Sequence, residues 1–161
     1  MKIFISIVVA ALIVAGAWWW MEHPESVSNI PLPVSSSTAA QEKYAYVPGN
    51  LLLGTDATTT GKYLIASNGM TLYTFARDAG NVSSCTGLCT KTWPPYTISS
   101  REALSNIQAG IGGKVDAVTR GDNGLMQVTY DEQPLYFFSG DQVSGDTKGD
   151  GIGNLWSLAR P

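Results

Sequence analysis

Apolar and polar positions alternate in several short runs of this chain, and no run has the helical periodicity that a parallel α/β sheet requires. A two-residue period predicts strands, because successive side chains of a strand point to opposite faces. The predicted strands are residues 62–67, 70–75, 114–120, 127–130 and 134–138. Ser99 followed by Glu102 fits a capping box, which predicts a short helix or 3₁₀ turn over residues 101–107. The expected fold class is all-β, or β with one short helix.

Two pairs of these strands are joined by turns of different composition. Asn68 and Gly69 both tolerate positive φ, so a type I′ turn is predicted between the first two strands. The corresponding turn near Asp131 and Glu132 lacks glycine, and a wider or bulged loop is expected there. Pro134 cannot donate to a ladder, so it should be the first residue of its strand.

The pattern also repeats within the chain, at an offset of 63 positions. Leu72, Tyr73, Phe75, Asp78 and Trp93 recur as Leu135, Tyr136, Phe138, Asp141 and Trp156. Internal self-similarity of this kind indicates a duplicated structural unit. We therefore expect two tandem repeats based on β-hairpins, residues 62–96 and 125–159, within one compact domain that covers residues 44–161.

An uncharged apolar segment, residues 3–21, precedes the domain. As a helix it is long enough to span a bilayer, and Lys2 before it and Glu22 after it favour export of the rest of the chain. The segment is therefore either a signal anchor that binds the membrane or a signal peptide cleaved after Ala17. Residues 22–43, rich in Ser and Pro, are predicted to be a disordered linker. Both alternatives place the domain on the extracytoplasmic side of the cell membrane, or secrete it.

Composition excludes several classes of function. The 161 residues carry a net charge of −3 without a basic run, so no nucleic-acid partner is expected. The one histidine, His23, lies outside the predicted domain, so a Ser/His/Asp or Cys/His catalytic arrangement cannot be built within it. The usual zinc sites are excluded as well, since the domain has two cysteines and no histidine. We expect neither an enzyme nor a cofactor.

Cys85 and Cys89 are separated by three residues, in a chain that is expected to be exported. An oxidising compartment favours a disulfide between them. The alternative is a redox-active pair, although that activity usually belongs to a CxxC sequence at the start of a helix.

The acidic and aromatic residues of the repeats each allow two interpretations. Asp78 and Asp141 are either turn caps that accept backbone N–H bonds or a pair acting as acid and base or as cation ligands. Asp141, Asp146 and Asp150 are weak calcium candidates, because their loop lacks the spacing of an EF-hand. The repeated aromatic residues are expected in the core, and the alternative is a groove for a flat ligand or a glycan. These aromatic residues are Tyr73, Phe75, Trp93, Tyr136, Phe138 and Trp156.

Over residues 63–158 the chain resembles a bacterial secreted-repeat family, often described as predicted lipoproteins with a Yx(F/W/Y)xxD motif. The matching segments are YTFARD at residues 73–78, CTGLCTKTWPP at 85–95 and QVTYDEQPLYFFSGD at 127–141, followed by Gly149, Gly151 and Trp156. The resemblance implies tandem repeats and an envelope location, and brings no established activity. The chain departs from many members in lacking a lipobox cysteine and in having Glu132 where glycine is common.

The expected function is a non-enzymatic binding or scaffold domain at the cell envelope. Two alternatives remain open: a thiol-disulfide or electron-transfer accessory protein that uses Cys85 and Cys89, and an adhesion module stabilised by calcium at Asp141, Asp146 and Asp150.

Overall fold

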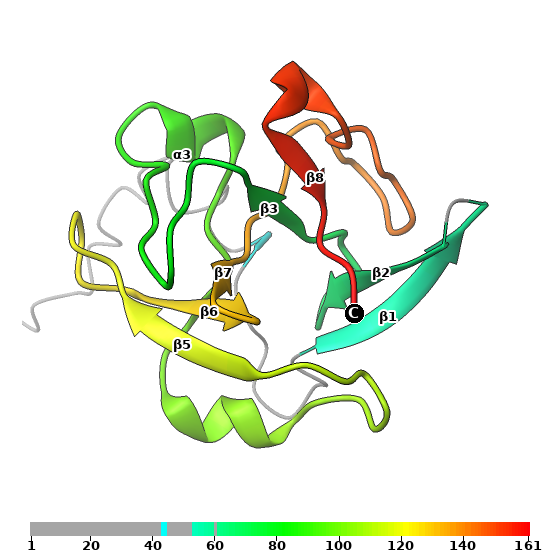
Figure 1. Cartoon of the computed structure of the whole chain (residues 1–161), viewed down its shortest axis with the longest axis horizontal. Coiled ribbons are helices and arrows are strands. Elements are labelled where there is room, and N and C mark those ends of the chain that lie inside the picture. Colours follow the sequence, from blue (N-terminus) through cyan, green and yellow to red (C-terminus); the bar gives the residue numbers. More distant parts are fainter. Residues whose placement is uncertain (1–42, 45–52, 60) are drawn as a thin grey trace, which may run out of the picture. The chain divides into compact units, whose positions relative to one another are not determined.

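The structure is a computed structural model, and it describes residues 43–44, 53–59 and 61–161 (Figure 1). The predicted membrane segment, residues 3–21, and the predicted linker up to residue 42 lie outside the described residues. Within the part of the chain that is described, no helix is long and apolar enough to cross a membrane.

Strands are the main regular secondary structure of the described residues, and the helical segments are short. The strands are β1 (Leu53–Thr58), β2 (Gly61–Ala66), β3 (Tyr73–Phe75), β4 (Thr97–Ile98), β5 (Val115–Thr119), β6 (Met126–Tyr130), β7 (Gln133–Pro134) and β8 (Trp156–Leu158). The helical segments are α3 (Cys89–Thr92) and two 3₁₀ helices, η1 (Arg101–Ser105) and η2 (Ile152–Asn154). A mostly β fold is confirmed, and η1 lies where a short helix or 3₁₀ turn was expected.

The predicted capping box at the start of η1 is wrong. The N-cap residue is Ser100, which has extended backbone angles and makes no capping bond to the helix through its side chain. The helix begins one residue later than a box from Ser99 to Glu102 requires, because with Ser100 as N-cap Glu102 is the second helical residue and not the third. Glu102 bonds instead to the Ser100 side chain, which lowers the pKa of Glu102.

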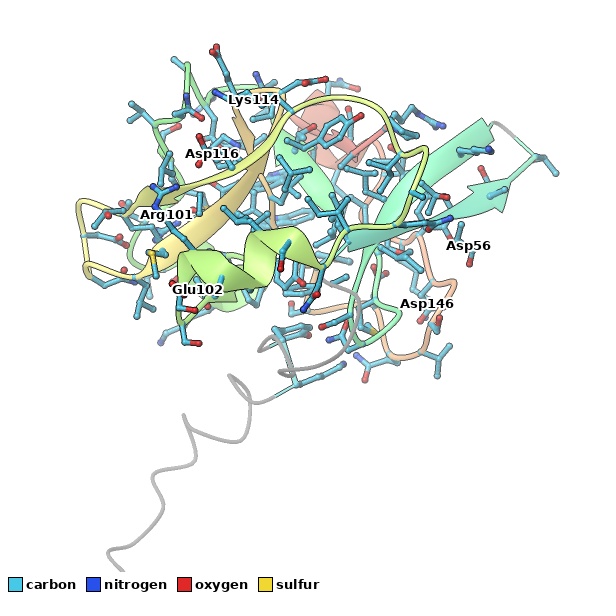
Figure 2. The ribbon with its side chains drawn as sticks, turned by 90° about the horizontal axis from the view of Figure 1, so that it is seen from below. Asp56, Arg101, Glu102, Lys114, Asp116 and Asp146 are labelled. Carbon is cyan, nitrogen blue, oxygen red and sulfur yellow. A yellow bond between two sulfur atoms is a disulfide. The ribbon has the colours of Figure 1, made fainter. Side chains whose placement is uncertain are left out.

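Each repeat opens with an antiparallel hairpin, β1–β2 in the first and β5–β6 in the second. Strand β1, which the alternation pattern did not predict, pairs with β2 from Leu53 opposite Ala66 to Thr58 opposite Gly61. One side chain from η1 bonds to the edge strand β5. Arg101 donates to the Ala117 carbonyl at 2.6 Å and to the Asp116 carboxylate at 2.6 Å, and Figure 2 shows Arg101 near Asp116. Covering an edge strand in this way disfavours pairing with another chain.

The turn after β2 differs from the prediction. Ala66 N–H donates to the Met70 carbonyl at 3.0 Å, and Gly69 N–H donates back to the Ala66 carbonyl at 2.9 Å. The loop therefore has three residues, and only Gly69 has a positive φ, 76°. Asn68 instead uses its side chain, which accepts from Met70 N–H and donates to the Lys43 carbonyl. These side-chain bonds favour the longer loop over a type I′ turn.

The turn after β6 is the tighter one, also against the prediction. Tyr130 pairs with Gln133 across a two-residue turn, in which Asp131 and Glu132 have φ of 45° and 66°. Asp131 exchanges two hydrogen bonds with Lys114: its N–H donates to the Lys114 carbonyl, and its carboxylate accepts from the Lys114 N–H. These bonds offset the strain of a left-handed conformation without glycine. Strand β7 begins at Gln133, one residue before the predicted Pro134.

The closing strand of each repeat pairs with the other repeat. Strand β8 of the second repeat pairs with β3 of the first, and β4 of the first pairs with β6 of the second. In Figure 1, β3 and β8 lie side by side although they are far apart in sequence. Spacing along the chain does not show which repeat a strand joins, so this exchange was not predicted.

Two rings of three backbone hydrogen bonds mark the exchange. In one ring, Leu64 N–H donates to Ala159, Ala159 N–H to Leu72, and Leu72 N–H to Leu64, at 2.8, 2.9 and 3.0 Å. The second ring joins Val128, Tyr96 and Leu135 in the same order, at 2.9, 2.9 and 3.0 Å. The two repeats thus have the same backbone arrangement, related by an approximate twofold axis.

Two clusters of buried side chains lie on opposite sides of residues 72–75. Leu72 belongs to a mainly aliphatic cluster with Leu64 and Leu135, whereas Tyr73 and Phe75 belong to an aromatic cluster. This division follows from strand alternation, since neighbouring residues point to opposite faces. The motif residues of both repeats therefore meet in the aromatic cluster.

Candidate functional site

The tyrosine of each repeat bonds to the aspartate of the other. Tyr73 donates its hydroxyl hydrogen to Asp141 Oδ2 at 2.7 Å, and Tyr136 donates to Asp78 Oδ2 at 2.7 Å. The backbones of the two tyrosines also exchange N–H to carbonyl bonds, at 2.8 and 3.0 Å. The YxFxxD pattern therefore joins the two repeats rather than closing each repeat on itself.

Both aspartates are buried, and each also accepts a backbone N–H from the loop that follows it. Asp78 Oδ1 accepts from Ser84 N–H and the Ser84 hydroxyl, both at 2.7 Å. Asp141 Oδ1 accepts from Lys148 N–H at 3.0 Å. The geometry is that of the loop cap considered for these residues, with a tyrosine added. Both carboxylates are committed to internal donors, and burial raises the pKa of Asp141.

The repeated aromatic residues form a column around the approximate twofold axis. The column runs Phe75, Trp156, Trp93, Phe138, with neighbouring ring centroids 4.2, 3.8 and 4.6 Å apart. The two tryptophans at its centre are parallel to within 3°. Their faces cover each other, so the column packs as core and leaves no slot between its rings for a flat ligand.

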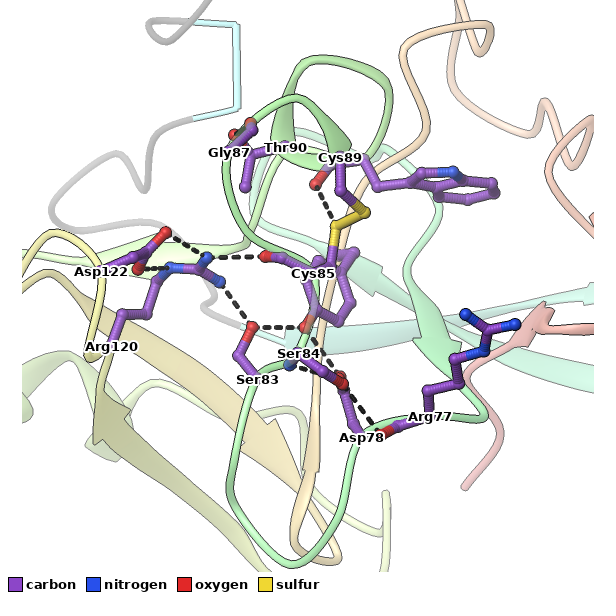
Figure 3. Close-up of a disulfide and its surroundings, with 12 residues drawn as sticks. Arg77, Asp78, Ser83, Ser84, Cys85, Gly87, Cys89, Thr90, Arg120 and Asp122 are labelled. Atoms are coloured by element: carbon purple, nitrogen blue, oxygen red, sulfur yellow. Dashed lines mark hydrogen bonds and ion pairs between the residues drawn. A yellow bond between two sulfur atoms is a disulfide. The ribbon is translucent and has the colours of Figure 1, made fainter.

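The disulfide predicted between Cys85 and Cys89 is confirmed. It lies in the second half of the segment that we call the first-repeat loop, residues 79–92, and Figure 3 shows its surroundings. Cys85 is buried and Cys89 is partly exposed at the start of α3. Between them, Leu88 is 78% exposed.

A buried arginine holds this loop from the second repeat. Arg120, at the end of β5, has a fully buried side chain that makes five hydrogen bonds. Two go to the Asp122 carboxylate and one to Gln127 Oε1. The remaining two reach the first-repeat loop, at Ser83 Oγ (2.7 Å) and the Cys85 carbonyl (2.8 Å). A buried guanidinium is stable only when its donors are satisfied, as they are here.

The arginine is connected to the motif aspartate of the first repeat. Ser83, which accepts from Arg120, contacts the Tyr136 hydroxyl at 2.5 Å, and Tyr136 donates to Asp78. The network therefore runs from Asp122 at the surface to Asp78 in the core (Figure 3). Sequence reasoning missed Arg120, because a single arginine ending an alternating run resembles a strand residue that faces solvent.

A groove of about 380 Å³ lies between the first-repeat loop and the end of β5. One wall is formed by Asn81, Val82, Ser83 and Thr86, and the other by residues 118–122. Val82 is 63% exposed, and Val118, which also lines the groove, is partly exposed. The groove thus combines aliphatic side chains with a polar rim, which is typical of surfaces that bind other molecules.

The three calcium candidates have separate structural roles. Asp146 accepts from the N–H groups of Gln142 and Val143 and from Lys148 Nζ, which lowers its pKa to about 2. Asp150 accepts from Leu158 N–H, and Asp141 is engaged as described above. Among the described residues, no group of three acidic, cysteine or histidine side chains comes together to hold a metal ion.

A family model described as a secreted repeat of unknown function matches residues 54–97 and 117–160. The two matched segments begin 63 positions apart, the same offset that relates the two motifs. The chain matches no curated protein and no solved structure.

Proposed function

The chain belongs to the family of secreted repeats, and we propose that its domain is a non-enzymatic binding or scaffold module of the cell envelope. In this proposal, the partner binds in the groove between the first-repeat loop and the end of β5. The partner is a polypeptide that places an aliphatic side chain between Val82 and Val118 and bonds to the polar rim.

The observation that carries this proposal is the rigid presentation of exposed aliphatic side chains. Val82 and Leu88 are exposed on a loop that is fixed by the disulfide, by Arg120 and by Asp78. Ordering such a loop in advance lowers the entropic cost of binding. Binding residues commonly lie on loops that a rigid scaffold positions.

The chemistry of the site supports binding over catalysis. The two motif carboxylates, Asp78 and Asp141, are buried and already accept hydrogen bonds from protein donors. Tyr73 and Tyr136 are also buried, which raises the pKa of both phenols further above neutral pH. An acid or base that acts on a substrate must reach its proton, and these groups are directed at one another.

Site-specific photo-crosslinking tests the proposal. A benzophenone amino acid replaces Val82 in the full chain, which is expressed in its native envelope and irradiated. Val143, in the corresponding loop of the second repeat, is equally exposed at 63% and supplies the matched control. We expect a discrete cross-linked product from position 82 and none from position 143. Identical results at the two positions would contradict the proposed surface.

We also propose that residues 3–21 hold the domain at the extracytoplasmic face of the membrane. The supporting feature is their uncharged apolar sequence, with Lys2 before it and Glu22 after it, a charge order that favours export of the rest of the chain. Intact mass measurement of the protein from membrane and medium tests this. A chain that retains these residues supports the anchor, and a chain that begins at residue 18 shows cleavage after Ala17.

A further inference from the structure

The role of the disulfide can be judged by comparing the segment that contains it with the corresponding segment of the second repeat. Asp78 and Trp93 of the first repeat correspond to Asp141 and Trp156 of the second, and the span between them has the same length in both. The second repeat closes this span without a covalent bond: Asp146 accepts from two backbone N–H groups and Asp141 from Lys148 N–H. The scaffold of the repeat therefore does not require a disulfide, and the bond between Cys85 and Cys89 has a local role.

The disulfide lies beside backbone groups that bond to Arg120 and Asp78. Of the two Arg120 bonds that reach the first-repeat loop, one ends on the carbonyl of Cys85 itself and the other on Ser83, two residues before it. Ser84, between them, donates its N–H and hydroxyl to Asp78. Three successive residues beside the disulfide thus bind two buried charged groups. A shift of this backbone leaves donors of a buried guanidinium unsatisfied, which is costly.

The two cysteines of the disulfide differ in exposure. Cys85 is 1% exposed, whereas Cys89 is partly exposed and follows two exposed residues, Gly87 and Leu88. An incoming thiolate can therefore reach the sulfur of Cys89 more easily than that of Cys85. Thiol-disulfide exchange depends on this access as well as on the thiols.

From these observations we propose that the Cys85–Cys89 bond is a redox switch that sets the shape of the groove through Arg120. This inference rests on the proposed function, because it regulates the same groove. With the disulfide intact, Ser83 and the Cys85 carbonyl accept hydrogen bonds from Arg120, and the groove is formed. With the bond reduced, residues 83–85 leave Arg120, and both walls of the groove loosen.

The chemistry requires a dithiol as reductant. One of its thiolates attacks Cys89 Sγ, the bond between the two cysteine sulfurs breaks, and Cys85 departs as a thiolate that takes up a proton. The second thiol of the reductant then attacks the mixed disulfide on Cys89 and releases that cysteine as a thiol. Two electrons and two protons pass to the protein, and the reductant becomes a disulfide.

Hydrogen exchange on the full chain tests the switch, with dithiothreitol as the dithiol. We expect reduction to accelerate exchange in residues 79–93 and also in residues 115–123, by roughly tenfold for the loss of one bond to a charged group. Residues 141–156, the corresponding part of the second repeat, should not change. Acceleration confined to residues 85–89, or equal acceleration in the second repeat, would overturn the proposal. So would a bond that dithiothreitol fails to reduce in the folded chain.

A variant separates the role of Arg120 from that of the disulfide. Arg120→Lys in the oxidised chain removes the guanidinium group that donates to Ser83 and the Cys85 carbonyl. This variant should accelerate hydrogen exchange in residues 79–93 while the disulfide stays intact. Arg101→Lys, at an exposed arginine of η1 that bonds to Asp116 and Ala117 of β5, is the matched control and should leave that segment unchanged. Equal effects of the two variants would show that the coupling does not pass through Arg120.

Cross-linking from position 82, with and without dithiothreitol, links the switch to the proposed function. A cross-linked product that disappears on reduction supports both. If no product forms in either state, the proposed function fails, and the exchange experiment still decides on the switch. A product of equal yield in both states supports the binding surface and rejects the regulation.

Discussion

Tyr73 of the first repeat donates a 2.7 Å hydrogen bond to Asp141 of the second, and both side chains are buried. The corresponding bond from Tyr136 to Asp78 runs the opposite way across the approximate twofold axis. The motif that identifies each repeat is thus the contact that holds the two repeats together. Its disruption should affect the stability of the whole domain rather than of one repeat.

Tyr73→Phe should destabilise the domain by about 1–3 kcal/mol, because it leaves a buried carboxylate oxygen of Asp141 unsatisfied. Urea unfolding measures the change. In a double-mutant cycle with Asp141→Asn, we expect the two effects to be non-additive, since both variants change the same contact. Tyr130→Phe is the control, because its hydroxyl makes only a long 3.4 Å bond to Ile111, and it should cost less. Additive effects in the cycle would contradict the assigned contact.

Asp122 should stabilise the domain in a pH-dependent way. The hydrogen bond from Arg120 lowers the pKa of Asp122 below its ordinary value of 3.8. A carboxyl group with a lowered folded-state pKa contributes stability that is fully present above the unfolded-state value and is lost as pH falls through the folded-state value. Unfolding of wild type and Asp122→Asn should therefore differ most above pH 4 and converge in stronger acid.

The pKa of Asp141 is shifted in the opposite direction from that of Asp122, which gives a comparison. Burial raises its pKa above 3.8, so ionisation of the Asp141 carboxyl group opposes folding. Its contribution to the stability of the domain therefore falls as pH rises from the unfolded-state pKa to the folded-state pKa. The difference in stability between wild type and Asp141→Asn should therefore decrease over that interval. Parallel pH curves for the Asp122 and Asp141 variants would contradict both assignments.

Much of this arrangement follows from the sequence, and the remainder depends on contacts that sequence spacing does not encode. The 63-residue repeat, the mostly β fold and the disulfide between Cys85 and Cys89 were predicted correctly. The pairing of Tyr73 with Asp141 was not, because the motif spacing is the same whether a tyrosine bonds within its repeat or across to the other. The burial of Arg120 likewise depends on acceptors, Ser83 and the Cys85 carbonyl, that lie 37 and 35 positions away.

The two hairpin turns were also predicted wrongly from local sequence. Glycine content predicted the tighter turn at Asn68 and Gly69, whereas the structure has it at Asp131 and Glu132. The conformation of each turn depends on hydrogen bonds with residues distant in sequence, Lys43 at the first turn and Lys114 at the second. Local propensity was outweighed by hydrogen bonds that form only in the folded domain.

Glu132→Gly should stabilise the domain, by up to about 1 kcal/mol, because it relieves a left-handed conformation in a residue with a side chain. Thermal unfolding measures the effect. Asp131→Gly is the matched control: it relieves the same kind of strain but removes the carboxylate that accepts from Lys114 N–H. We expect this second variant to be less stable than Glu132→Gly. The reverse order would show that the bond to Lys114 does not hold the turn.

Gly149→Ala should destabilise the domain by about 1–3 kcal/mol through overpacking. A Cβ atom at this position would lie 2.8 Å from the Tyr73 ring and 3.0 Å from Trp93, both packed in the aromatic cluster. Gly121→Ala is the control, because a Cβ there meets no atom within 4 Å and neither glycine has a positive φ. Equal urea midpoints for the two variants would mean that the aromatic column can shift to accept the methyl group.

The exchange of strands between repeats makes a prediction about a nicked chain. A protease site inserted between Ala109 and Gly110, in an exposed segment between the repeats, divides the described domain into a half that contains β1 to β4 and a half that contains β5 to β8. The halves share the β3–β8 and β4–β6 pairs and both tyrosine–aspartate bonds, so they should remain associated after cleavage. We expect the nicked protein to elute as one species in buffer and as two fragments in urea.

Each half alone should lack a stable fold, because its ring of backbone bonds is completed by a residue of the other half: Ala159 completes the first ring and Tyr96 the second. Circular dichroism of the separated fragments, alone and after mixing, measures this. Recovery of the strand signal only on mixing would show that the repeats fold as one unit. A folded isolated half would show that hairpin and loop are sufficient, and that the exchanged strands add stability without determining the fold.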